Sequence, residues 1–378
     1  MLIHVVTPGD NLTSLSRTYD VTIDSIVQNN GLKVEDPLVV GQSIIIISPQ
    51  FPTNKLGTLQ VLGYAYPHID RGVLSAALPY LTYLAIFSYG IRPDGSLFEP
   101  DDAELLQLAK EAGVAPSLVL TSITEDGSFS TENASLLFNS EEAQTTLINN
   151  LIQVIQAKGY RAVDVDFEFV PPTDRQAYID FVRRLTTTLN PLGIIVSVAL
   201  APKTSVEQPG LLYEAHDYAG LGSVANEVLL MAYEWGYTYG PPMAVAPLNK
   251  VNQVALFATT QIPPSKTSLG IPNYGYDWPL PWIEGTVATS IGNQEAINIA
   301  RNNNATIRFD TVAQTPTFEY TSATGTPHVV WFEDARSIEA KLKLVNGYNL
   351  QGIGIWNLMR PFTQMWVVIR QYFDIKKI

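Results

Sequence analysis

The sequence of 378 residues contains no cysteine. That absence excludes disulfide bonds, zinc–thiolate sites and a cysteine nucleophile. The sequence also has no run of the roughly 18 uninterrupted apolar residues that a membrane-spanning helix needs. Met1 is followed by a short strand-like segment, without the basic and apolar regions of a secretory signal peptide, so we expect no conventional signal.

Positive charge is scarce as well. Lysine and arginine number 23 against 36 aspartate and glutamate residues, which gives a net charge of −13. This balance, with no local basic cluster, argues against nucleic acid and anionic membrane as partners and leaves a neutral polymer as a suitable one. The four histidines show no metal-ligand spacing, so we predict no metal site, and we expect no cofactor.

The first 48 residues form a pattern of strand, helix, helix, strand. A short strand leads through a Pro-Gly turn into a helix with Leu12 and Leu15 on its apolar face. A second helix carries Ile23 and Ile26, and residues 43–47 are the closing strand. The pattern predicts a small βααβ module.

The residues of this module resemble the LysM family, in the opening VVTPGDNL and the closing LVVGQSIII. The resemblance implies binding to glycans that contain N-acetylglucosamine, such as peptidoglycan or chitin, in a groove between two loops. The glycan-binding positions that it carries over are Gly9, Asp10, Asn11, Leu12, Gly31 and Leu32.

A linker separates this module from the rest of the chain. Residues 49–55 include Pro49 and Pro52, which favour extended backbone. We therefore predict a module over residues 1–48, a linker over 49–55 and a larger domain over 56–378. We also expect the module to act as an independent clamp, whose removal leaves the hydrolysis rate on short soluble substrates unchanged.

The larger domain alternates strand and helix patterns, which predicts a parallel sheet with right-handed crossovers. Eight strands predict an α/β fold of the (β/α)8 TIM-barrel type. The gap after the seventh strand is too long for one crossover helix, so we expect a small α+β insertion at about residues 278–332. The expected strands span residues 59–65, 83–88, 117–121, 163–168, 194–200, 227–233, 267–271 and 352–356.

The stretch GYRAVDVDFEFV, residues 159–170, carries the clearest chemical signal. Successive side chains of a strand point to opposite faces, so Asp164, Asp166 and Glu168 share one face. Mutual repulsion and lost hydration raise the pKa of at least one such acid toward the range of a general acid. Pro171 follows closely, which places Glu168 at the carboxyl end of the strand, where α/β barrels keep their active sites. A Mg²⁺ site for phosphoryl chemistry is an alternative use of three carboxylates.

This stretch resembles the last three acids of the D-x-x-D-x-D-x-E signature of glycoside hydrolase family 18. LLMAYEWGY, LGIPNYGYDW and GIGIWNL extend the resemblance over three later strands. The segment VWFEDARSIEAKL, together with the leading LysM pattern, is most similar to the spore cortex-lytic, SleL-type branch of the family. The family's leading Asp-Gly is replaced here by Arg161 and Ala162.

The resemblance implies hydrolysis of β-1,4 bonds at N-acetylglucosamine in peptidoglycan or chitin, by retaining, substrate-assisted catalysis. It makes Glu168 the general acid and base, Asp166 the residue that orients the acetamido group, and Asp164 the residue that holds Asp166. Tyr233 is then the hydrogen-bond donor to the acetamido carbonyl. The substrate-binding positions that we predict are Met231, Trp356, Glu234, Tyr89, Tyr274 and Trp278.

Two wider expectations follow. A chitinase-like lectin without catalysis is the competing function, and the presence of Glu168 favours the enzyme. A LysM pattern directly after Met1 suggests a protein of the spore coat, the spore cortex or the cell wall. We expect it to act on glycan as a monomer, with neither nucleic acid nor membrane as a partner.

Overall fold

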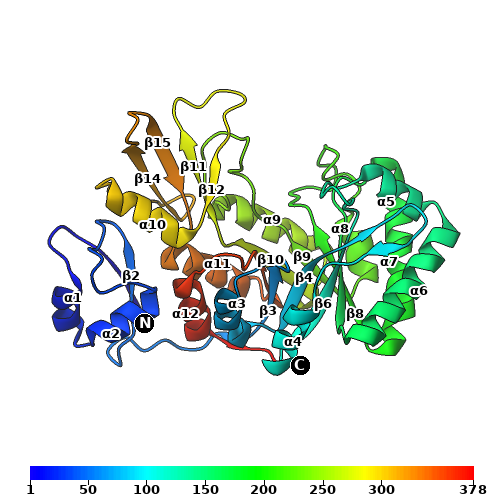
Figure 1. Ribbon diagram of the computed structural model, residues 1–378, viewed down its shortest axis with the longest axis horizontal. Coiled ribbons are helices and arrows are strands. Elements are labelled where there is room, and N and C mark those ends of the chain that lie inside the picture. The colour runs from blue at the N-terminus through cyan, green and yellow to red at the C-terminus, as the bar shows by residue number, and fades with distance from the viewer.

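The computed structural model describes all 378 residues and consists of three parts, a small N-terminal module, a barrel and a lobe inserted into the barrel (Figure 1). The N-terminal module lies beside the last helix of the chain, and the lobe stands above the same side of the barrel. The predicted fold class is confirmed in all three parts. None of the helices is both long and apolar enough to cross a membrane.

The N-terminal module pairs its two strands in antiparallel fashion, with Leu2 opposite Ile46. Asn11 caps the first helix by accepting a hydrogen bond from the Ser14 amide, and Gly31 closes the second helix in the left-handed conformation. The apolar faces of both helices form a small core with the closing strand. The elements are β1 (Leu2–Val5), α1 (Leu12–Tyr19), α2 (Ile23–Asn30) and β2 (Ser43–Ile46).

The barrel is a closed ring of eight parallel strands, because β3 pairs with both β4 and β16. Valine, leucine and isoleucine on the outward faces of these strands pack against the surrounding helices. A further strand, β17 (Phe373–Ile375), extends along β3, and β5 (Leu97–Phe98) extends along β4. The ring consists of β3 (Gly57–Ala65), β4 (Tyr83–Ile91), β6 (Ala115–Thr121), β7 (Ala162–Asp166), β8 (Ile195–Leu200), β9 (Glu227–Leu230), β10 (Thr267–Pro272) and β16 (Gly352–Trp356).

The helices around the ring follow the predicted apolar periodicity. In α7, for example, Phe181, Leu185 and Leu189 are buried at spacings of four residues. The helices are α3 (Arg71–Ala77), α4 (Ala103–Glu111), α5 (Thr131–Phe138), α6 (Glu141–Lys158), α7 (Arg175–Leu189), α8 (Tyr218–Val224), α9 (Leu248–Gln261), α11 (Ala335–Gly347) and α12 (Thr363–Tyr372).

The inserted lobe is an antiparallel sheet with one helix packed against it. It begins at Gly275, three residues earlier than the expected residue 278, because Tyr276 already pairs with Trp331 in the lobe's own sheet. The elements are β11 (Gly275–Pro279), β12 (Thr289–Ile291), α10 (Asn293–Asn302), β13 (Arg308–Asp310), β14 (Thr315–Thr321) and β15 (Pro327–Trp331).

The N-terminal module is packed against both the barrel and the lobe. Ile45 belongs to the main core of the barrel, and Val39 belongs to the core of the lobe. The Ile307 amide donates a 2.9 Å hydrogen bond to the Val40 carbonyl. A Cβ atom on Gly41 would lie 1.8 Å from the Ile307 carbonyl oxygen, so the approach requires glycine. The module is therefore docked on the rest of the chain, and is not the separate clamp on a linker that the sequence predicts.

Candidate active site

Strand β7 carries the first two acids of the expected site on the inner face of the barrel. Asp164 lies opposite Ser197 of β8, and Asp166 lies opposite Thr121 of β6. Val163 and Val165 point the other way, into the core under the helices. Alternation along one strand thus places two carboxyl groups in the barrel interior.

Asp164 is held from two sides. Its side chain has no exposed surface, and its two oxygens accept hydrogen bonds of 2.7 Å from the Tyr64 hydroxyl and 2.6 Å from the Ser197 hydroxyl. Burial raises the pKa of Asp164, and these two hydrogen bonds oppose that rise. With both oxygens occupied, Asp164 is a fixed support and not a free reactant.

Asp166 is buried but incompletely partnered. Its side chain is 6% exposed, and one carboxyl oxygen has no hydrogen-bond partner within the protein. Burial, followed by the charges of Glu168 and Asp164, holds the pKa of Asp166 well above its usual range. A buried polar atom without a partner is costly, so a bound group, or a side-chain rotation, that gives this oxygen a hydrogen-bond donor would be favourable.

Glu168 lies just beyond β7, at the carboxyl end of the barrel. The strand ends at Asp166, two residues earlier than expected, and Phe169 adopts a left-handed conformation with φ of 56°. Glu168 is half-buried. Burial and the charge of Glu234 raise its pKa to about 7, which lets it both donate and accept a proton near neutral pH.

A second acid stands at the rim of the site. Glu234 follows β9, and its carboxylate accepts hydrogen bonds from the hydroxyls of Tyr274 and Tyr276. Restricted solvation around the carboxylate raises the pKa of Glu234, and the two phenols oppose the rise. Tyr274 therefore orients Glu234, and the negative charge of Glu234 acts on Glu168.

Aromatic side chains complete the site. Tyr233 is half-buried, and burial with the charges of Asp166 and Glu168 raises its pKa well above the usual range, so that it remains a hydrogen-bond donor. Trp356 ends β16 and meets Phe87 edge-on, with 5.0 Å between ring centroids. Trp356 remains partly exposed, which suits an apolar floor for a sugar ring. Met231 is also half-buried near the carboxyl end of β9.

Comparison with known proteins agrees with this geometry. The sequence model of glycosyl hydrolases family 18 matches residues 60–360, which include all of these positions. The chain belongs to glycosyl hydrolase family 18. The LysM domain model matches residues 4–46, within the N-terminal module. The family 18 chain is thus a glycosidase with an N-terminal LysM module.

Several relatives align with this chain over their full length. The cortical fragment-lytic enzyme of Bacillus subtilis (strain 168) is 36% identical over 100% of this chain and 99% of its own. That of Bacillus anthracis is 37% identical over 100% of both chains. The crystal structure of the Bacillus cereus spore cortex-lytic enzyme SleL is similar, with 34% identity, a TM-score of 0.94, and coverage of 100% of this chain and 99% of that one.

Two of the predicted substrate-binding residues of the family 18 domain have structural roles instead. Tyr89 has no exposed surface, because its hydroxyl bonds to the buried carboxylate of Asp102 outside the barrel. Trp278 is equally buried, and its indole N–H donates a 3.0 Å hydrogen bond to the Gly240 carbonyl. Neither ring can contact a substrate, so both assignments are wrong.

The predicted LysM positions divide in the same way. Leu12 and Leu32 are buried in the core of the module, so their side chains cannot contact a glycan. The Asp10 carboxylate accepts from the Thr7 amide and hydroxyl. The exposed positions are Gly9, Asn11 and Gly31, and a Cβ atom on Gly31 would lie 2.7 Å from Thr363 Oγ1 of the barrel.

The supporting roles of three residues were not predicted from the sequence. Ser197 and Tyr64 hold Asp164, and the signal for Ser197 is a lone hydroxyl in the middle of an apolar strand. His216 is fully buried, accepts from the Ala201 amide and donates to the Phe167 carbonyl, which joins the loops after β7 and β8. Burial lowers the pKa of His216 to about 4, so it stays neutral. No group of three or more His, Asp and Glu side chains is placed to hold a metal ion.

Proposed function

We propose that this family 18 glycosidase hydrolyses β-1,4 bonds at N-acetylglucosamine by retaining, substrate-assisted catalysis. The observation that carries the proposal is that Glu168, whose pKa is about 7, acts through its charge on the buried Asp166, which has one unpartnered oxygen. An acid poised to give a proton stands beside a site for a polar substrate group. Asp164 is held by Tyr64 and Ser197, which leaves it no free oxygen. Substrate-assisted catalysis is known for family 18, and we propose that here too the substrate's own acetamido group supplies the nucleophile.

In the first step, the carbonyl oxygen of the substrate's 2-acetamido group attacks C1 of the same sugar. The C1–O glycosidic bond breaks, and the leaving oxygen takes the proton of Glu168. The product is an oxazolinium ion, whose positive charge is stabilised by Asp166. Tyr233 donates a hydrogen bond to the acetamido oxygen and fixes its direction, while Trp356 and Met231 shape the floor under the ring.

In the second step, the Glu168 carboxylate takes a proton from water as the water oxygen attacks C1. The bond between C1 and the acetamido oxygen breaks, which restores the acetamido group and leaves the sugar with its original anomeric configuration. Asp164 holds Asp166 in place throughout. Glu234 lies at the rim, where it contacts the substrate, and its charge keeps the pKa of Glu168 high. Tyr274 is buried, and its hydroxyl orients the Glu234 carboxylate by donating a hydrogen bond to it.

The natural substrate that we propose is peptidoglycan of the spore cortex, with chitin as the alternative polymer. Relatives that align over the whole chain are cortical fragment-lytic enzymes, which supports the first choice. The LysM module supplies a second contact to a glycan of the same class, through Gly9, Asn11, Gly31 and neighbouring backbone. We further propose that the protein acts as a monomer at the spore coat, cortex or cell wall.

Parallel product analysis tests this proposal. Purified cortex fragments and chitin oligomers are incubated with the enzyme, and products are separated by mass while the anomeric configuration of the first product is followed by NMR. We expect N-acetylglucosamine at the new reducing end, released first as the β-anomer. An inverted first product would overturn the mechanism, and cleavage at N-acetylmuramic acid would overturn the bond specificity.

A further inference from the structure

Four buried carboxamide side chains lie between the LysM module and the floor of the active site, and the backbone of residues 333–335 joins the two on the module's side to the two near the floor. They are Asn30 of the module, Gln364 of α12, Asn293 of α10 and Asn273 between β10 and β11, and each is less than a tenth exposed. A buried amide side chain needs hydrogen-bond partners for its polar atoms, so the surrounding groups fix the position and orientation of each of these side chains.

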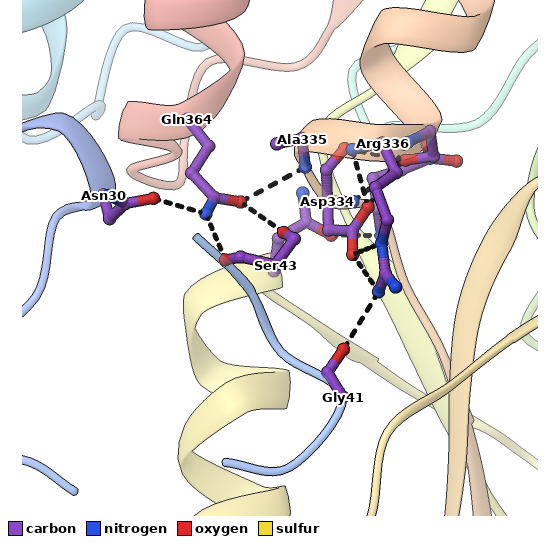
Figure 2. Close-up of polar contacts among 10 residues, drawn as sticks. Asn30, Gly41, Ser43, Asp334, Ala335, Arg336 and Gln364 are labelled. Atoms are coloured by element: carbon purple, nitrogen blue, oxygen red, sulfur yellow. Dashed lines mark hydrogen bonds and ion pairs between the residues drawn. The ribbon is translucent and has the colours of Figure 1, made fainter. Parts of the chain in front are cut away.

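The path begins where Gln364 meets the module. Its amide nitrogen donates to Asn30 Oδ1 at 2.9 Å and to the Ser43 carbonyl at 2.8 Å (Figure 2). Its oxygen accepts from the Ala335 amide at 3.2 Å, at the start of α11. Asn30 in turn binds the Ile45 backbone inside the module. One side chain therefore joins the module's core to the barrel.

A second group of contacts fixes the same face. Arg336 donates to the Gly41 carbonyl at 3.1 Å while it is paired with Asp334, the cap of α11. Figure 2 shows Arg336 and Gln364 reaching the module from neighbouring helices on either side of Asp334. Residues 330–342 carry the segment that resembled the cortex-lytic branch, and here they form the junction of module, lobe and barrel.

From this junction the path continues toward the substrate. The Glu333 amide donates to Asn293 Oδ1 at 2.8 Å, and Asn293 donates to Asn273 Oδ1 at 3.4 Å. The Asn273 side chain donates to the carbonyls of Asn357 and Arg360, both at 2.9 Å. Its backbone amide donates to the Trp356 carbonyl at 2.8 Å. Asn273 thereby holds the segment that carries the sugar floor.

We infer that Gln364 and Asn273 are positioning residues, through which the docked LysM module supports Trp356 in the geometry that hydrolysis needs. The inference rests on the proposed role of Trp356 as floor of the sugar site. A floor that shifts slightly reduces turnover even when substrate still binds, because the reacting atoms must be aligned. The module is then part of the catalytic unit as well as a glycan clamp.

Gln364→Leu in the full-length protein tests the inference, with Gln107→Leu on the exposed face of α4 as the matched control. We expect three changes in Gln364→Leu: faster protease cleavage in residues 49–55, faster amide hydrogen exchange in residues 352–360, and a fall in kcat on a chitin oligomer. The fall is expected to be about 3- to 30-fold, with a smaller change in KM. The control changes none of these.

Gln364→Glu is the second variant, because leucine in a polar junction risks misfolding. Glutamate keeps the oxygen that accepts from the Ala335 amide and the Ser43 hydroxyl. It removes the donors to Asn30 Oδ1 and the Ser43 carbonyl, so the loss falls on the module's side. The same three changes are expected. Unaltered exchange at residues 352–360 in a folded variant, whether or not the linker is cleaved faster, would overturn the inference. The exchange measurement needs no turnover, so it stands apart from failure of the proposed reaction.

Discussion

Ser197 donates a 2.6 Å hydrogen bond to Asp164 across the neighbouring strands β8 and β7. The two residues are direct partners in the parallel register, so the bond is built into the sheet and not into a loop. Together with the Tyr64 hydroxyl, it leaves Asp164 with both oxygens engaged, whereas Oδ1 of Asp166 is buried without a partner. The hydrogen-bond partners therefore distinguish Asp164, a fixed support, from Asp166, which can still gain a partner.

Ser197→Ala removes one of these partners. We expect a loss of about 1–3 kcal/mol in the free energy of unfolding, the usual cost of an unsatisfied buried polar group. The pKa of Asp164 rises further, because a bond that lowers it is lost. A several-fold fall in kcat accompanies this. Urea denaturation and steady-state kinetics measure both, with the exposed Ser223→Ala of α8 as control; equal stability of the two variants would contradict the assignment.

Glu168→Gln keeps the shape of the side chain and removes its transferable proton. Turnover should fall by roughly 10²- to 10⁴-fold, the contribution expected of a general acid and base, while the thermal midpoint stays close to that of the wild type. Glu142→Gln, at an exposed position on α6, is the control and retains full activity. A Glu168→Gln enzyme with near-normal turnover would rule out this residue as the acid.

The pH dependence of hydrolysis follows from the same group. Glu168 must be protonated to act as the acid, and its pKa is about 7. We therefore expect kcat/KM to be high below pH 7 and to fall as the pH rises through about 7. Glu234→Gln removes a negative charge that raises this pKa. We therefore expect the alkaline limb of the profile to move to lower pH in that variant. A limb that stays in place would show that Glu234 does not act on Glu168.

The alternation of apolar and acidic residues was sufficient to predict the central strand and its inward acids. The partners of those acids were harder to predict, because register between strands distant in sequence decides them. Ser197 meets Asp164 only once β7 and β8 are aligned in parallel. A polar residue inside an apolar strand is a weak signal by itself, since its neighbour across the sheet is unknown.

Tyr89 shows a second limit. Phe87 faces the barrel interior beside Trp356, and strict alternation would place Tyr89 on the same face. The pairing of β4 with β6 shifts between Ile86 and Tyr89, which turns Tyr89 outward to Asp102. The prediction that Trp278 binds substrate was wrong for another reason. Its strand leaves the barrel and pairs inside the lobe. Irregular pairing of this kind leaves little trace in the sequence.

Tyr89→Phe checks this correction. The variant loses the hydroxyl that bonds to Asp102, although Tyr160 and Lys158 still reach that carboxylate. We expect a loss of roughly 0.5–1.5 kcal/mol in unfolding free energy, the net value of one hydrogen bond, with kcat and KM unchanged. Tyr274→Phe is the matched substitution at the site rim and should alter the pH profile through Glu234. A raised KM in Tyr89→Phe with normal stability would restore its role in substrate binding.

Deletion of residues 1–53 distinguishes a docked LysM module from a tethered one. Removal exposes the polar face around Gln364 and Arg336 and the apolar surface that packs against Ile45. We expect a thermal midpoint that is lower by about 1–2 °C for each kcal/mol lost at this chain length. We also expect a reduced kcat on short chitin oligomers and a larger loss on insoluble cortex, where avidity disappears too. The control is the full-length protein cut within residues 49–55, whose module remains docked by noncovalent contacts and whose activity on oligomers should persist. A truncated enzyme with an unchanged midpoint and full oligomer activity would mean that the module contributes binding alone.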